Sequence, residues 1–165
     1  MTDEEFARCI TDMTRTLFRV CYAQLRQDYD REDAVQEALR KAWQKRYTLR
    51  DERYLQTWII RILINECHAI QRRSRRLQPQ ETLPERAALQ PMDGTPLHDA
   101  LLALDEKYRM PLVLHYMEGY SVADVAAALR IPQGTVKTRL KKGREELRKI
   151  LNEQKGRYMD RETIR

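Results

Sequence analysis

The side chains best suited to chemistry in this sequence lie within the stretch GYSVADVAAALRIPQGTVKTRLKKGREEL, residues 119–147. The second half of this stretch predicts an amphipathic helix, which at about 100° per residue gathers an apolar arc of Val136, Leu140, Gly143 and Leu147. The opposite side is basic and carries Lys137, Thr138, Lys141 and Lys142. A helix docked by its apolar side, with lysines and a hydroxyl in its first half, has the form that enters a major groove. The pattern therefore predicts a helix that reads duplex DNA.

A second predicted helix precedes the basic one and must hold it in place. Ser121 can cap this helix, and apolar residues recur behind the cap at helical spacing, namely Val122, Val125, Ala126 and Leu129. Pro132 then breaks the pattern, because a proline disfavours helical geometry in its predecessor and suits a first helical position itself. The two helices and the turn between them match a helix-turn-helix motif. A lone basic helix is more often an ordinary solvated helix, and the capped partner argues against that interpretation.

A further helix, TWIIRILINECHAIQRRSRR, has a basic face on the side opposite its apolar stripe, and this face consists of Arg61, Asn65, His68 and Arg72. His68 is expected to be a plain surface imidazole. Asn65 stands out because asparagine is a mediocre helix former and its paired donor and acceptor suit a base edge. Simple tolerance of an exposed asparagine is the alternative. The helix ends in an arginine block, residues 72–76, which can neutralise several phosphates. Ile60 and Ile64 lie off the stripe, so this helix is expected to pack against two neighbours or against a partner.

Two nearby segments present polar side chains that could meet a partner. The helix expected over residues 30–45, with Asp30 as its cap, leaves Asp33, Gln36, Glu37 and Arg40 on a polar face. Plain solvent exposure is the ordinary interpretation of such a face. Residues 46–54, RYTLRDERY, are expected to form a loop whose arginines and tyrosines could hold single-stranded bases. Such mixtures also arise by chance in loops.

Bulk composition favours a polyanionic partner and excludes several classes of protein. Lys and Arg number 31 against 25 Asp and Glu, which gives a net charge of +6 and a pI near 9.3. No apolar run approaches the roughly 20 residues that span a bilayer, so we expect a cytoplasmic protein without membrane insertion. Three cysteines with no CxxC pair predict neither a disulfide framework, a metal site nor a cofactor. Adjacent Asp105 and Glu106 diverge on a helix, so neither an enzyme nor a small-molecule substrate is expected.

The expected fold is all-α, with two small helical domains joined by a flexible linker. The first domain spans residues 1–76 and opens with a helix over residues 3–27, started by a capping box of Thr2 and Glu5. Residues 77–96 are rich in proline and polar residues and are expected to be the linker. The helix-turn-helix domain spans 97–151, with a kink or a helix start at Pro111. Residues 152–165 are expected to be a polar tail that frays.

In this order, these pieces resemble an extracytoplasmic-function (ECF) sigma factor of the sigma-70 family, over nearly the whole chain. The segments DREDAVQEALRKAW and TWIIRILINECHAIQRRSRR are similar to the family's promoter-melting region 2. The segment LDEKYRMPLVLHYMEGYSVADVAAALRIPQGTVKTRLKKGREELR is similar to region 4, and GTVKTRL nearly repeats the family's most recognisable string. Either block alone could be an unrelated helical module, whereas both in order across a proline-rich linker are specific.

The resemblance implies an RNA polymerase sigma factor that binds core polymerase and directs initiation at specific promoters. The polar face of Asp33, Gln36, Glu37 and Arg40 would bind the coiled-coil helices of the beta-prime subunit, with the beta subunit as a further partner. The loop at 46–54 would hold a melted minus-10 base together with Trp58, Arg61, Asn65, Arg72 and Arg73. The minus-35 element would be read by Lys137, Thr138, Lys141 and Lys142, with Thr135, Arg139 and Arg144 near phosphates.

Two positions depart from the family's pattern. Ala69 stands where an acidic residue is frequent, and Ile60 where an aromatic is common, which weakens the expectation of base stacking. Regulation is expected to come from an anti-sigma factor, which could hold the protein at the membrane. The alternative function is a stand-alone dimeric helix-turn-helix repressor or activator, which would use its N-terminal half to dimerise and would footprint DNA without polymerase.

Overall fold

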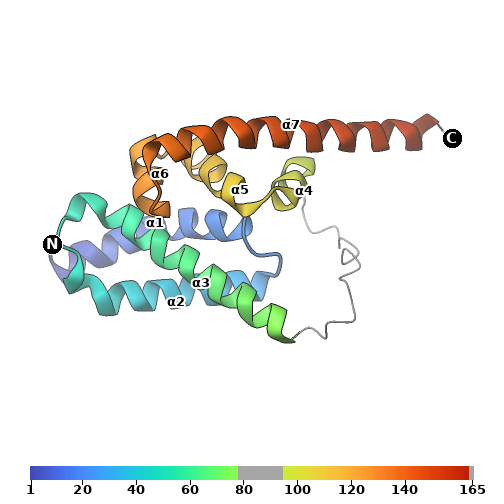
Figure 1. Ribbon diagram of the computed structural model, residues 1–165. Helices are drawn as coiled ribbons and strands as arrows, with labels where there is room; N and C mark the ends of the chain where they lie inside the picture. Colours follow the sequence, from blue (N-terminus) through green and yellow to red (C-terminus); the bar gives the residue numbers. More distant parts are fainter. Residues whose placement is uncertain (78–94, 164–165) are drawn as a thin grey trace.

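The structure is a computed structural model that describes residues 1–77 and 95–163. Its helices form two groups that pack on each other (Figure 1). The first group contains α1 (Asp3–Tyr22), α2 (Asp28–Lys45), the 3₁₀ turns η1 (Arg46–Thr48) and η2 (Glu52–Tyr54), and α3 (Leu55–Leu77). The second contains α4 (Pro96–Ala103), α5 (Glu106–Leu112), the π-helical turn η3 (Val113–Met117), α6 (Val122–Leu129) and α7 (Gln133–Thr163). The described residues contain no strand, which confirms the all-α class.

The ends of α1 and α2 show both a confirmed and a corrected expectation. Thr2 Oγ1 accepts from the Glu5 amide at 3.2 Å, and a Glu5 carboxylate oxygen accepts from the Thr2 amide at 2.7 Å, so the capping box is present. The first helix stops at Tyr22, however, and not at residue 27. Arg31 explains the early stop, because its guanidinium donates to the carbonyls of Leu25 at 2.8 Å and Arg26 at 3.0 Å. The second helix starts at Asp28, so Asp30 lies inside it and is not its cap.

The core of the first group is made where α3 crosses α1 and α2. Completely buried residues meet there from all three helices, namely Leu17, Val20 and Cys21, then Ala34, Ala38 and Ala42, then Ile59, Ile60, Leu63 and Cys67. Ile60 and Ile64 are both buried because α3 also packs against α6. The expectation that this helix has two neighbours is therefore confirmed. Among residues 1–77 and 95–163, no helix combines the length and apolar character needed to span a bilayer.

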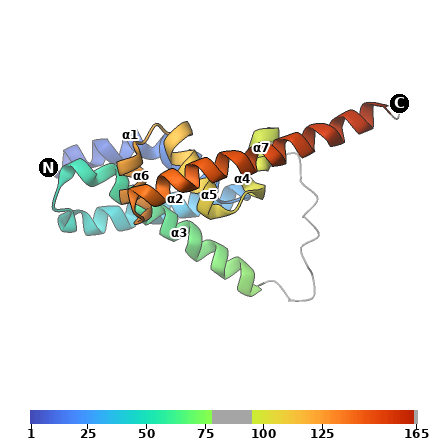
Figure 2. The same ribbon diagram turned by 45° about the horizontal axis from the view of Figure 1, so that its top comes forward.

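The second group is built around α7, which crosses the molecule above α3 (Figures 1 and 2). Pro111 lies inside α5, and the chain continues into η3 without a new helix start. The expected frayed tail is instead helical, since α7 has 31 residues and reaches Thr163. Its last turns are rich in glutamate, glutamine, lysine and arginine, which are good helix formers. This second half projects past the rest of the molecule (Figure 1).

The expected linker falls almost entirely on residues 78–94, which lie outside the described residues. The two groups nevertheless touch directly. Helix α3 of the first group packs against α6 of the second, and polar contacts described below join α1 to the residue after η3 and α3 to α5. The domain boundaries predicted from the sequence stay predictions.

Candidate nucleic-acid interface

The turn between α6 and α7 has the geometry that the sequence predicted. Ser121 Oγ accepts from the Asp124 amide at 3.1 Å and starts α6. Arg130 ends that helix in the left-handed region at φ 56°, and the Ile131 amide bonds the Ala126 carbonyl at 3.1 Å. Such a left-handed residue satisfies the last carbonyls of a helix and turns the chain sharply. α7 begins immediately after Pro132.

Gly143 allows α7 to lie close to α5. A Cβ added there would lie 3.1 Å from Leu112 Cδ1 and 3.2 Å from Tyr108 Cβ. Val136 and Leu140 are buried on the same face of α7. The apolar arc predicted on this helix is therefore its docked face, and Gly143 sets how deeply the helix sits.

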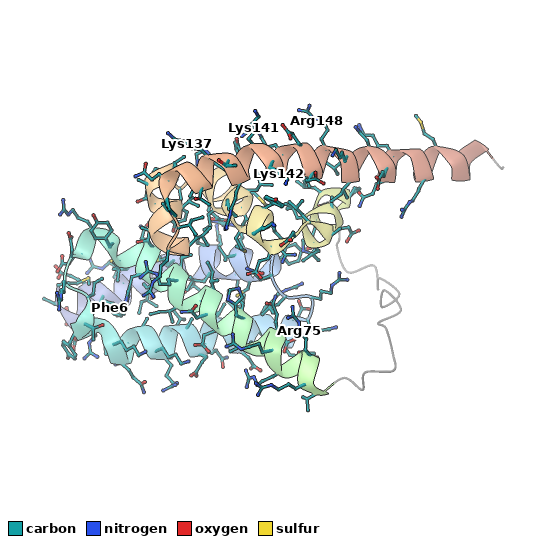
Figure 3. The ribbon with its side chains drawn as sticks, in the orientation of Figure 1. Phe6, Arg75, Lys137, Lys141, Lys142 and Arg148 are labelled. Carbon is teal, nitrogen blue, oxygen red and sulfur yellow. The ribbon has the colours of Figure 1, made fainter. Side chains whose placement is uncertain are left out.

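The opposite face of α7 is exposed and basic. Lys137, Lys141 and Arg148 point outward from the molecule (Figure 3). Thr138 is also exposed, with its hydroxyl donating to the Gly134 carbonyl at 3.0 Å. The remaining predicted minus-35 residues are less free. Lys142 lies 5.6 Å from the Tyr108 ring centroid, and a hydrogen bond with the Tyr108 hydroxyl raises the pKa of Lys142.

Three other members of the predicted minus-35 set lie at the edges of this basic face. Thr135 and Arg139 are half-buried, and Arg139 faces the first group of helices. Arg144 is exposed, and its guanidinium donates to the Tyr116 hydroxyl. Of the predicted minus-35 residues, Lys137, Thr138 and Lys141 are thus the ones that face solvent and could enter a DNA groove.

Helix α3 carries the predicted minus-10 residues, but not all of them face solvent. Asn65, Arg72 and Arg73 are exposed, whereas Trp58 is half-buried. Arg61 is also half-buried, because its Nη2 donates to the carbonyl of Ala127 in α6. Arg61, one of the residues predicted to hold a melted base, is therefore bonded to the helix-turn-helix in this arrangement.

The loop at residues 46–54 places aromatic rings at the surface. Tyr47 is 76% exposed and Tyr54 is 52% exposed. The Arg46 guanidinium lies 4.1 Å from the ring centroids of both Trp43 and Tyr47, and Arg46 Nε donates to Asp3 at 2.8 Å. Stacked guanidinium and aromatic planes are the elements that single-stranded nucleic-acid sites use.

The polar face of α2 is exposed as expected, with one internal ion pair. Asp33, Gln36 and Arg40 are exposed, and Glu37 is half-buried. Arg40 Nε donates to Glu37 at 2.9 Å, and this hydrogen bond holds the pKa of Glu37 below its usual range. Lys41, beside them, donates to the buried carboxylate of Glu66 and so links α2 to α3. The orientation of this face is thus fixed relative to α3.

Contacts between the two groups of helices were not predicted from the sequence. Arg19 in α1 binds Glu118 through two hydrogen bonds of 2.7 and 2.8 Å. His68 Nε2 bonds Glu106 Oε1, and Gln24 Nε2 donates to the same oxygen at 3.0 Å. The His68 bond is the main cause of the lowered pKa of Glu106. His68, expected to be a plain surface imidazole, is therefore part of a contact that no local pattern could indicate.

Two protein-family models match this chain, one over each of the two groups of helices. The model of Sigma-70 region 2 matches residues 9–77, and that of Sigma-70, region 4 matches residues 95–147. The RNA polymerase sigma-E factor of Streptomyces coelicolor is 32% identical over 154 residues, covering 90% of this chain and 85% of that protein. The chain belongs to the ECF sigma factors of the sigma-70 family. The ECF RNA polymerase sigma factor SigW of Bacillus subtilis is 28% identical over 91% of this sigma factor and 90% of its own length.

Solved structures share the fold of this sigma factor. One is the sigma factor RpoE of Bartonella quintana in complex with the anti-sigma factor NepR, with a TM-score of 0.75, 24% identity and coverage of 90% of this chain and 98% of that one. Another is CnrH in complex with the cytosolic domain of CnrY, with a TM-score of 0.69, 23% identity and coverage of 92% and 90%. In this sigma factor the region 2 match ends with α3, and the region 4 match covers α4 to the middle of α7. The contact of α3 with α6 therefore joins region 2 to region 4.

Proposed function

We propose that this sigma factor directs core RNA polymerase to promoters by reading minus-35 duplex DNA with α7 and capturing a melted minus-10 base with α3. The observation that carries the proposal is the outward face of α7. Lys137, Thr138 and Lys141 follow a capped helix and a sharp turn and stay exposed, and the two lysines point away from the body of the molecule (Figure 3). A docked helix with this face suits the major groove, where lysine and hydroxyl groups reach base edges.

In the proposed function, α3 and the neighbouring loop at residues 46–54 hold the melted minus-10 base. Asn65 would use its amide on a base edge, Arg72 and Arg73 would hold phosphates, and Tyr47 or Tyr54 would stack on the flipped base. Trp58 would support this surface from its half-buried position. Because Arg61 is bonded to the Ala127 carbonyl, region 4 must move off α3 before Arg61 can take part. Promoter melting is thus coupled to separation of the two regions.

The partners follow from the family. The α2 face of Asp33, Gln36, Glu37 and Arg40 would bind the beta-prime subunit of core polymerase, which performs the chemistry, so the sigma factor needs no catalytic residue of its own. The fold-level likeness to a sigma factor that was solved in complex with an anti-sigma factor supports regulation by an anti-sigma factor. We place the protein in the cytoplasm, where core polymerase acts.

Run-off transcription tests the proposal. Core polymerase and a candidate promoter should give a transcript of defined length only when this protein is added. Lys141→Ala should lower that transcript, whereas Lys149→Ala, the same change on α7 at a residue paired with Glu146, should not. A footprint on the promoter without polymerase, together with no transcript, would refute the proposal and favour the stand-alone repressor.

A further inference from the structure

A cavity of about 390 Å³ lies between region 2 and region 4. It is bounded by α3, by α5, by the end of α6 with the turn that follows it, and by α7. Its size falls in the range of about 300–1,000 Å³ that small-molecule sites occupy. We call it the interdomain cavity. It exists only while the two regions are docked, because each supplies one wall.

Three arginines from three different elements line the interdomain cavity. Arg61 comes from α3, Arg130 from the end of α6 and Arg139 from α7. Within residues 1–77 and 95–163, none of the three forms an ion pair with a carboxylate. Arginines gathered without anionic partners are an arrangement that an anion would stabilise.

The two acidic residues that line the same cavity are already engaged by the protein. Glu106 accepts hydrogen bonds from Gln24 and bonds His68. Asp105 Oδ1 accepts from the Lys107 amide at 3.3 Å, at the start of α5. Both carboxylates keep their negative charge in these bonds, but Lys107 lies beside them. With the three arginines, the lining besides His68 therefore carries four cationic and two anionic side chains.

The side chain of Arg61 and the backbone of Arg130 are held in position before any ligand binds. Arg61 is fixed by its bond to the Ala127 carbonyl, while its Nε is buried and has no hydrogen-bond partner among the described residues. The backbone of Arg130 is fixed in the left-handed conformation by the helix-capping bonds of α6. Burial and, second, the charge of Arg130 lower the pKa of Arg61, as expected where cations are crowded.

We propose that the interdomain cavity binds a small anion that carries two or three phosphate groups. The guanidinium is planar and presents donors in a fork that matches phosphate oxygens, and the excess of cationic over anionic side chains in the lining favours a polyanion. Since the site needs walls from both regions, bound anion stabilises the docked arrangement over the separated one. The phosphorylated ligand would thereby oppose the separation that the proposed function requires.

Calorimetric titration of the full chain with inorganic tripolyphosphate tests this site. Saturable one-to-one binding is expected, and Arg130→Gln and Arg139→Gln should each weaken it at least tenfold. Arg148→Gln removes the same charge from α7 at an exposed position outside the cavity, and it should change affinity less than twofold. The assay contains neither polymerase nor promoter, so its failure is distinct from failure of the proposed sigma activity.

Two further measurements distinguish specific binding in the cavity from nonspecific attraction of the anion to a positively charged surface. Arg139→Lys keeps the charge but loses the fork, so its affinity should fall between those of the wild type and Arg139→Gln. Circular dichroism should show the same helicity in every variant. Absence of saturable binding to the wild type, or an equal loss in Arg148→Gln and Arg139→Gln, would overturn the proposal.

Discussion

Replacing Gly143 with alanine tests how closely α7 must approach α5. The added methyl group would lie 3.1 Å from Leu112 Cδ1 and 3.2 Å from Tyr108 Cβ. The Leu112 methyl group can rotate away, but Tyr108 Cβ is attached directly to the α5 backbone. The two helices must therefore move apart, which shifts α7 outward from its packed position on α5.

The expected magnitude follows from two opposing effects. Overpacking of this kind costs about 1–3 kcal/mol, whereas replacing glycine with alanine inside a helix gains up to about 1 kcal/mol. Gly143→Ala should thus lower the free energy of unfolding by about 1 kcal/mol. Gly156→Ala is the matched control, since position 156 is in the same helix with no atom within 4 Å of the new Cβ. Gly156→Ala should increase helicity and should not lower the free energy of unfolding.

Urea unfolding followed by circular dichroism measures both variants. Gly143→Ala should shift the midpoint to lower urea, while Gly156→Ala should leave the midpoint unchanged or raise it. Equal stabilisation by the two substitutions would refute the packing role given to Gly143. A larger side chain, as in Gly143→Val, should deepen the loss.

Three more predictions address function and pH. Asn65→Ala should weaken open-complex formation, read by permanganate reactivity, more than closed-complex footprinting; equal losses would argue against base capture. Lys141→Ala should relax minus-35 preference by about 1 kcal/mol or more, and a uniform loss over all promoter sequences would indicate a phosphate contact. The pKa of Glu106 is lowered by its bond to His68, so its stabilising contribution is complete above the ordinary value of 4.5 and is lost as pH falls below it. Unfolding of Glu106→Gln should accordingly depend less on pH in that acidic range than the wild type does, and identical profiles would contradict the assignment.

Features set by local sequence were predictable. The Ser121 cap, the break before Pro132 and the apolar arc through Val136 depend on residues within a few positions of one another, and backbone geometry fixes what such spacings do. The second packing face of α3 was also visible, because Ile60 and Ile64 are too apolar to remain exposed. Local pattern therefore supplied the motif and its docked face.

Features set by distant partners were not predictable. Cys21 and Cys67 lie 46 positions apart, yet their sulfurs are 3.7 Å apart in the core, where the hydrogen bond between them and burial raise the pKa of Cys67. Arg61 was assigned to solvent because its partner is 66 positions away, across the expected linker. Such contacts join residues that are far apart in the chain, so no regular spacing in a single sequence reveals them.

Under the proposed function, in which Arg61 helps to hold the melted strand, the contact of Arg61 with α6 sets a thermodynamic limit on promoter affinity. Arg61 has other donors, but in the docked arrangement it is half-buried against α6, so docking and the binding of a promoter strand compete for access to this side chain. The apparent dissociation constant is then the intrinsic one divided by the fraction of molecules that are undocked. With roughly one molecule in a hundred undocked, DNA affinity falls by about a hundredfold. A partner that separates the two regions, as core polymerase is proposed to do, would raise promoter affinity without touching a single nucleotide.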